Sequence, residues 1–279
     1  MGLRHWIGLA AFAGLAACAS IERLAIPAAD LKGPAFTQSG SVSGVDHDAW
    51  DAFLSAYAFE DEAGVVRVRY GDVTAEDSAA LDAYIARLSD TETIGLTRDA
   101  QLAYWVNLYN AATVQVILAH YPVSSIRKIK DGFFDLGPWD EKRLTVRGES
   151  FSLHDIEHRV VRAVWDDDPR PHYILNCAAT GCPDLGLKAY RGATINAAMD
   201  AAARDYVNDP RGVQIDDKGL VTASKIYSWY LGDYGGTRRS ALAHIKLYAE
   251  PTLKARLDEA ETINRFVYDW SLNDGTSAR

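Results

Sequence analysis

The sequence has few cysteines, no long apolar run and no concentration of positive charge. Its 29 Lys and Arg residues are outnumbered by 38 Asp and Glu residues, and the basic ones are not clustered. Because nucleic-acid-binding proteins carry a positive face, this composition excludes that class of partner. Internal repeats, a G-x-S-x-G elbow and a phosphate-binding glycine loop are also missing. What is present is 48 % hydrophobic residues, which is ample for a globular core.

The first apolar stretch is too short to span a membrane and has the layout of an export signal. Arg4 precedes an uncharged apolar run, whereas a membrane-spanning helix needs about 20 apolar residues. The run ends in LAAC (15–18), which resembles a bacterial lipobox, whose cysteine becomes the lipid-modified start of the mature chain. We therefore expect a lipoprotein signal peptide at 1–17 and lipid attachment at Cys18. The alternative is an ordinary signal peptide that ends by chance in cysteine.

The residues after this signal predict a tether and a location. Ala19, and not Asp, follows Cys18. By resemblance to Gram-negative lipoproteins, this predicts the outer membrane, with the protein facing the periplasm and held by lipid alone. Residues 18–43 carry Pro, Gly and Ser without a sustained period, which is typical of a linker. Two cysteines then remain in an oxidising compartment, where a disulfide is the common outcome.

From residue 44 to residue 275 the chain has the periodicity of one folded domain. Helices are predicted at 47–60, 76–90, 97–121, 152–164, 194–207, 224–235, 238–250 and 251–260, and strands at 65–70, 143–148, 172–177, 212–224 (a hairpin) and 267–272. Helices outnumber strands and the strands are short. We therefore expect a mainly helical, single α+β domain with a small, short-stranded β-sheet.

The segment HDIEH (154–158) matches an inverted zinc-peptidase pattern. On an α-helix His154 and His158 lie at i and i+4, so both could hold a metal. The pattern needs a third ligand from a distant Glu, and the sequence singles none out. Glu157 and Arg162 fit equally well as an ion pair on a solvated helix face. A zinc-dependent hydrolase that uses this segment is therefore a second alternative, and we expect no metal or other cofactor.

Two cysteines stand close together in HYILNCAATGCPDL (172–185), and their roles are open. Cys177 ends the predicted strand among small residues, where a thiol with a lowered pKa could act as a nucleophile. His158 is the expected base. His172 would lie on the opposite side of a regular strand, roughly 16 Å from Cys177 at about 3.3 Å per residue, so it is not expected to pair with Cys177. Alternatively, Cys177 and Cys182 form a disulfide across a turn.

Asn107 and Asn110 interrupt the apolar helix QLAYWVNLYNAA (101–112). Their spacing of three places both on one buried face, where side-chain amides must be hydrogen-bonded. They are either structural clasps for a loop or polar groups that line a pocket. In the second case they could stabilise an oxyanion.

Five motifs in this order resemble domain-of-unknown-function family 547. They are YWVNLYNAA, SLHDIEHRVVR, HYILNCAATGCPDL, SKIYSWYLGDYG and YDWSLN, and the likeness extends over residues 43–275. The resemblance implies that His158 and Cys177 are the site residues. It also implies that His154 is not a family hallmark and that a Cys177–Cys182 disulfide is a local feature. It implies no activity.

Two functions follow as hypotheses. The first is a thiol-dependent hydrolase or acyl-transferase of the cell envelope, with Cys177 as nucleophile and His158 as base, oriented by Glu157 or an Asn. Its substrate would be an amide or thioester in a small-molecule or peptide-like ligand. The second is a non-catalytic binding or scaffold module with an aromatic groove, lined by Trp105, Trp139, Trp229 and Tyr230. The oligomeric state is left open.

Overall fold

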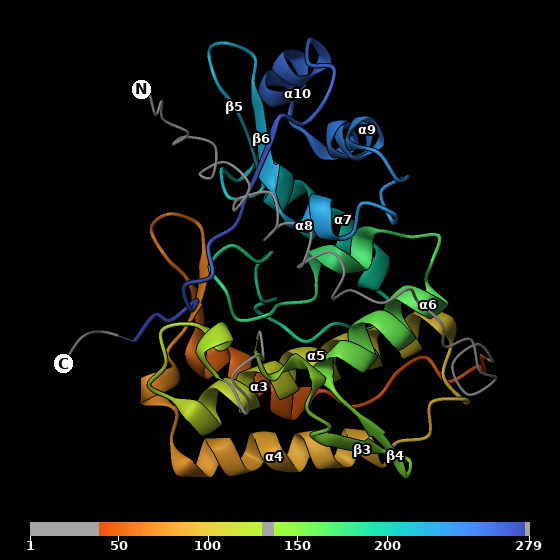
Figure 1. Cartoon of the computed structure of the whole chain (residues 1–279). Helices are drawn as coiled ribbons and strands as arrows, with labels where there is room; N and C mark the ends of the chain where they lie inside the picture. Colours follow the sequence, from red (N-terminus) through yellow and green to blue (C-terminus); the bar gives the residue numbers. More distant parts are fainter. Residues whose placement is uncertain (1–38, 130–136, 277–279) are drawn as a thin grey trace, which may run out of the picture.

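The computed structural model describes residues 39–129 and 137–276. It is a mainly helical α+β domain, as predicted, with short strands in small sheets (Figure 1). Within the described ranges, no helix is both long and apolar enough to cross a membrane. The predicted signal peptide and Cys18 lie outside the described residues.

The helices and strands follow the chain with short connections. The helices are α3 (Asp48–Tyr57), η1 (Tyr70–Asp72), α4 (Ala75–Ser89), α5 (Arg98–His120), η2 (Ile126–Lys128), η3 (Pro138–Asp140), η4 (Asp155–Val161), α6 (Arg162–Val164), η5 (Arg170–Tyr173), α7 (Ile195–Asn208), α8 (Ile226–Trp229), α9 (Arg238–Tyr248) and α10 (Pro251–Asp258). The strands are β1 (Ala58–Glu60), β2 (Val66–Val68), β3 (Leu144–Val146), β4 (Glu149–Phe151), β5 (Val213–Ile215), β6 (Val221–Ser224) and β7 (Arg265–Val267).

Helix α5 is the central element, and the sequence explains both of its ends. Thr97 caps it, because its hydroxyl accepts a hydrogen bond from the N–H of Ala100 at 3.3 Å. Pro122 follows the last turn and cannot continue a helix. Most side chains of α5 are buried on all sides, so its two asparagines must find partners inside the protein.

The strands form two hairpins and one three-stranded sheet. Strands β1 and β2 pair antiparallel, as do β3 and β4, while the third sheet has the order β5-β6-β7. The predicted hairpin at 212–224 is confirmed by the antiparallel pairing of β5 with β6. Gly219 in its turn has φ +77°, a conformation that glycine adopts without strain.

Buried hydrophobic side chains gather in two clusters. The larger contains α3, α4, most of α5 and the β3–β4 hairpin. The smaller contains side chains of α7, β5, β6, α8, α9 and α10. In Figure 1 the first occupies the lower part of the molecule and the second the upper part. The residues after β7 run down from the upper part, so they can contribute side chains to the region between the clusters.

The strand predicted at 172–177 is wrong. Residues 170–173 form the short 3-10 helix η5, and the buried chain beyond it joins no strand until a single bridge between Ala179 and Leu272. Pro169 and Pro171 explain the difference, because proline lacks a backbone donor and fixes φ near the helical value. A buried apolar run therefore need not be a strand.

Two smaller predictions also change. The helix expected at 224–235 is limited to the short α8, and the last strand, β7, lies earlier than expected. Within the stretch expected as a tether (18–43), Gly40 donates to the carbonyl of Leu96 at 2.8 Å and Val42 to that of Gly95 at 2.9 Å.

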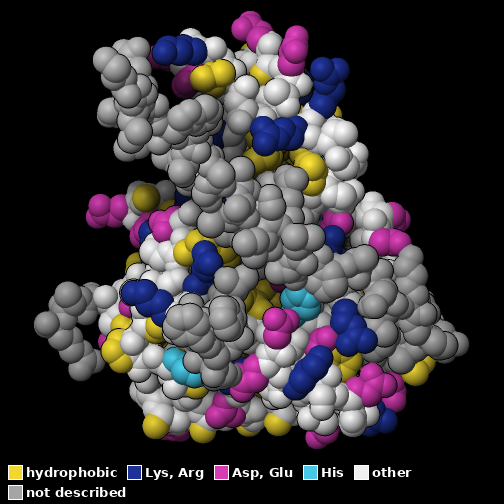
Figure 2. Space-filling model, in the orientation of Figure 1, with side chains coloured by type: hydrophobic (Ala, Val, Ile, Leu, Met, Phe, Trp, Pro, Cys, Tyr) yellow, Lys and Arg dark blue, Asp and Glu magenta, His cyan; other side chains and the backbone are white. Residues whose placement is uncertain are grey.

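The surface carries both signs of charge. On the face shown in Figure 2, acidic and basic side chains of the described residues are interspersed, and hydrophobic side chains are in small separate groups.

Candidate functional site

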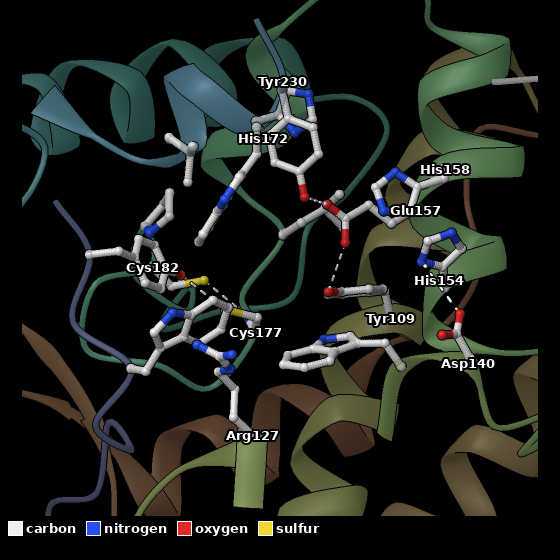
Figure 3. Close-up of a pocket in the computed structure, with 17 residues that line it drawn as sticks. Tyr109, Arg127, Asp140, His154, Glu157, His158, His172, Cys177, Cys182 and Tyr230 are labelled. Carbon is white, nitrogen blue, oxygen red and sulfur yellow. Dashed lines mark hydrogen bonds and ion pairs between the residues drawn. The ribbon is translucent and has the colours of Figure 1, made fainter. Parts of the chain in front are cut away.

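A cavity of about 180 Å³ lies between the two hydrophobic clusters (Figure 3). Its walls come from α5, η4, α8, the chain around Cys177 and the segment after β7. The lining residues that carry chemistry are Tyr109, Arg127, Glu157, His158, His172, Cys177, Cys182, Tyr230 and Tyr268. Pockets of this kind, largely apolar with a few convergent polar groups, are the usual form of small-molecule sites.

Glu157 and His158 are delivered by a π-helix, where the sequence predicted an α-helix. Two reciprocal hydrogen bonds fix its start: Ser152 Oγ accepts from the N–H of Asp155 at 3.1 Å, and Asp155 Oδ2 accepts from the N–H of Ser152 at 2.7 Å. From Asp155 to Val161 the turns then widen into π form. Single π turns are rare and frequently occur at functional sites.

Glu157 is a buried carboxylate held by two phenols. It accepts from the Tyr109 hydroxyl at 3.0 Å and from the Tyr230 hydroxyl at 2.5 Å (Figure 3). Burial acts to raise its pKa, but the charge of His158 in its protonated form and the hydrogen bonds from the two phenols outweigh that effect, so the pKa lies below its ordinary value. The cavity therefore contains a carboxylate that two phenol donors hold in place.

A second chain of contacts links His158 and His172, two of the three histidines that line the cavity, through an ion pair. Arg162 donates to both oxygens of Asp233, at 2.6 and 2.7 Å, and to His158 Nδ1 at 3.0 Å. His172 Nε2 contacts the same carboxylate at 2.8 Å. An arginine can only donate, so His158 Nδ1 is an acceptor and the proton of the neutral ring is on Nε2. By the same logic His172 donates from Nε2, which leaves Nδ1 as its acceptor.

Burial and ion pairing determine the protonation states of the groups in this chain of contacts. Burial lowers the pKa of His158 to about 3, so its imidazole is neutral near neutral pH. Asp233 is partly buried, which opposes ionisation, but the hydrogen bonds from Arg162 and His172 hold its pKa well below the usual range. His158 therefore presents a neutral N–H, and its acceptor nitrogen is already engaged.

His172 lines the same cavity as the cysteines, although the sequence did not predict that it pairs with Cys177. The sequence argument assumed a regular strand between His172 and Cys177, and η5 occupies part of this segment. The His172 ring also stacks on Tyr230, with centroids 3.9 Å apart. The partner that orients it, Asp233, is 61 residues away in sequence and carried no signal of its own.

The two cysteines are free thiols in contact with each other. The N–H of Cys177 donates to Cys182 Sγ at 3.1 Å, and Cys177 Sγ lies 3.1 Å from the Tyr268 hydroxyl. The neighbouring Cys182 sulfur and burial raise the pKa of Cys177 well above its ordinary value. Burial also acts on Cys182, but donors from Cys177 and Tyr268 outweigh it and lower the pKa of Cys182.

Asn110 on α5 fixes the shape of the cysteine loop, the segment that carries Cys177 and Cys182. Its Nδ2 donates to the carbonyl of Ile174 and its Oδ1 accepts from the N–H of Asn176, both at 2.9 Å. Asn176 in turn donates to the carbonyl of Pro183 at 2.8 Å and accepts from the N–H of Ala178 at 2.9 Å. Ala178 has φ +59°, which is rare for a residue with a side chain. The loop is thus held in a specific shape.

Asn107 on α5 holds the backbone at Tyr190 in the same way. Its Nδ2 donates to the carbonyl of Tyr190 at 2.9 Å, and its Oδ1 accepts from the N–H of Tyr190 at 3.0 Å. Neither asparagine is among the residues that line the cavity. Both side chains therefore make the backbone contacts that the structural alternative describes.

Aromatic side chains form one wall of the cavity. Trp229 lies beside Tyr268 and Trp270, with centroids 4.7 and 5.4 Å apart, and Trp139 contacts Trp270 at 5.8 Å. Arg127 lies over the Trp270 ring at 5.0 Å. Trp105, expected in this group, is instead in the core against Phe151. Tyr268 and Trp270 are part of this wall because the segment after β7 lies beside the cavity, and only the fold reveals that placement.

The zinc alternative finds no third ligand in the described part of the chain. The His154 and His158 rings lie 4.2 Å apart, and His154 Nδ1 is 3.6 Å from Asp140. Among the described residues, however, no group of three or more His, Cys, Asp and Glu side chains is arranged to hold a metal ion. His158 Nδ1 already accepts from Arg162.

Fold and cavity together define a mainly helical α+β protein with a buried thiol pair between two hydrophobic clusters. Residues 93–207 match the family model described as "Protein of unknown function, DUF547". The match includes α5, the π-helix and both cysteines, so it confirms the expected resemblance there; the wider range of 43–275 stays a prediction. No curated protein and no solved structure matches the chain.

Proposed function

We propose that this protein is a thiol-dependent hydrolase or acyl-transferase that acts on an amide or thioester bond of a small ligand. The observation that carries the proposal is the convergence of two hydrogen-bonded thiols and an Asp-oriented imidazole on one cavity. A thiol, a base and a third group that orients the base are the parts that nucleophilic acyl transfer requires. The cavity volume of about 180 Å³ suits a ligand of modest size.

In this proposal His172 is the proton acceptor and His158 is a hydrogen-bond donor. His172, held by Asp233 through Nε2, has Nδ1 as the nitrogen that accepts a proton. His158 has its proton on Nε2 and a pKa of about 3, so it acts as a neutral donor toward an oxyanion. This replaces the role of base first expected for His158. Glu157 keeps Tyr109 and Tyr230 in place beside these rings.

The test uses simple acyl donors, because the substrate is open. The full chain is incubated with a series of S-acyl thioesters and amino-acid anilides, with product release followed by chromatography and acyl adducts by intact mass. Turnover should fall at least 100-fold in a Cys177→Ala, Cys182→Ala double variant that melts within a few degrees of the parent. Cys18→Ala is the matched control and should keep full activity. Undiminished turnover in the double variant would overturn the proposal.

A binding module is the second candidate, and the aromatic wall favours it. Trp139, Trp229, Tyr268 and Trp270 offer large flat surfaces at one cavity, and such rings dominate the energetics of ligand contacts. If this is the function, ligands from the same series should quench tryptophan fluorescence equally before and after alkylation of both thiols. Loss of the quenching on alkylation would favour the enzyme.

We also propose that the chain is exported and anchored by lipid at Cys18, facing the periplasm from the outer membrane. The support is the charge order of residues 1–17 and the lipobox-like LAAC.

A further inference from the structure

The cavity contains two sulfurs, and they are not equivalent. Cys182 Sγ accepts a backbone hydrogen bond from Cys177 at 3.1 Å. Cys177 Sγ faces a hydroxyl, that of Tyr268, at 3.1 Å and the sulfur of Cys182. A thiolate is stabilised by donors aimed at the sulfur, whereas a thiol needs an acceptor for its own proton. The backbone N–H is fixed in direction and cannot become an acceptor.

Resting on the proposed thiol-dependent function, we propose that Cys182 is the reactive sulfur and that Cys177, with Tyr268, is its proton-holding partner. This reverses the assignment suggested by the sequence, in which Cys177 ends the apolar run. The clasp from Asn110 through Asn176 and the positive φ of Ala178 set the backbone so that the Cys177 N–H faces Cys182.

The surrounding groups agree with this assignment. Tyr268 keeps its proton, since burial raises the pKa of its phenol well above the ordinary value. The carboxylate of Glu157 opposes a thiolate, and the donors from Cys177 and Tyr268 outweigh it at Cys182. Solvent exposure alone would favour Cys177 as the reactive sulfur, because Cys177 is the more accessible of the two and Cys182 is only 5 % exposed. Reactivity that followed exposure would therefore single out Cys177.

The proposed reaction needs only the acyl donor, water and the side chains of the cavity. The Cys182 thiolate attacks the carbonyl carbon of an acyl donor RCO–SR′, so a new S–C bond forms and the C–SR′ bond breaks. The leaving thiolate takes the proton of the Cys177 thiol. Water then attacks the acyl group, its proton passes to the His172 ring and on to Cys177, and Cys182 leaves as thiolate. The products are RCOOH and R′SH.

The test is limited alkylation of the full chain with iodoacetamide between pH 5 and 10, with the labelled cysteine located by mass spectrometry. At pH 7, Cys182 should be labelled at least 10-fold faster than Cys177. Cys177→Ser should leave Cys182 reactive, and Cys182→Ser should leave Cys177 labelled only at alkaline pH. Tyr268→Phe should move the labelling profile of Cys182 to higher pH, which a purely structural tyrosine would not do.

Faster labelling of Cys177 at pH 7, or an unmoved profile in Tyr268→Phe, would overturn the assignment. Because no substrate is used, this result is independent of the turnover assay. If Cys182 labels first but no thioester is ever cleaved, the assignment stands and the proposed enzymatic function fails. Melting curves of each variant identify loss of fold, and for a variant that unfolds, the wild-type labelling order decides.

Discussion

At the scale of single residues, Asp233 joins two of the cavity histidines. It accepts two hydrogen bonds from Arg162, which contacts His158, and one from His172. Asp233→Asn removes the charge that pairs with Arg162 but preserves the shape. We expect the free energy of unfolding to drop by about 2 kcal/mol, below the cost for a fully buried pair because Asp233 is 24 % exposed.

Urea unfolding at pH 7 measures that loss. Asp258→Asn is the matched control, since Asp258 pairs with Lys254 on the surface and its removal should change little. Equal losses in the two variants would contradict the view that Asp233 organises the site.

A substitution at Tyr230 tests whether Glu157 is held as a charged acceptor. Tyr230→Phe removes one of two donors to Glu157, and hydrogen bonds to charged groups are the stronger kind, so we expect a loss of about 2 kcal/mol. Tyr227→Phe is the comparison, because the Tyr227 hydroxyl contacts only a neutral phenol, Tyr173, at 3.2 Å. That change should cost about 1 kcal/mol in the same unfolding experiment. A larger loss at Tyr227 would mean that Glu157 is not held as a charged acceptor.

At the scale of elements, the cysteine loop is fastened to the C-terminal segment that carries Tyr268. Gly181 donates to the carbonyl of Asp269 at 2.8 Å, and Thr180 to that of Ser271 at 2.7 Å. A side chain at Gly181 would lie 2.6 Å from the Asp269 backbone nitrogen, so the two segments would have to separate. This contact sets where the Tyr268 hydroxyl meets the thiols.

Gly181→Ala should therefore cost about 2 kcal/mol of stability and slow the alkylation of the thiol pair at pH 7. Gly44→Ala is the control, because open space surrounds that position and no stability should be lost. The measurement is urea unfolding together with iodoacetamide kinetics. If Gly181→Ala changes neither, the close approach of the two segments does not position Tyr268.

At the scale of the whole molecule, buried histidines make stability depend on pH. Burial lowers the pKa of His47 and His244 to about 4 and that of His158 to about 3, against 6.5 for an exposed imidazole. As the pH falls below 6.5, the unfolded chain binds protons that the folded protein refuses, so stability is full above 6.5 and decreases toward 4. Each histidine contributes about 1.4 kcal/mol per pH unit within that window.

Urea unfolding at pH 7, 6 and 5 checks this, and His47→Gln should reduce the slope by about a third, because it removes one of three such histidines. His47 is the better choice because it contacts Tyr84 at 2.7 Å and lies outside the cavity. A stability that rises on acidification would refute the neutral assignment.

The proposed lipid attachment at Cys18 is tested on the intact chain. Growth in the presence of a labelled fatty acid should place label on the wild-type protein and none on Cys18→Ala, which should leave the membrane fraction. Cys177→Ala and Cys182→Ala are the controls and should keep the label. Label that persists in Cys18→Ala would contradict the lipobox interpretation of residues 15–18.

The sequence by itself determined the fold class, the larger helices and the β5–β6 hairpin, because these depend on local periodicity and turn residues. It also identified Glu157, His158 and Cys177 as neighbours of one cavity. Tertiary structure alone decided the rest: the pairing of His172 with Asp233, the Tyr268 hydroxyl at the thiols, and the use of Asn107 and Asn110 as clasps. Those contacts join residues up to 91 positions apart, and spacing in sequence says nothing about which distant side chains a packed core brings together.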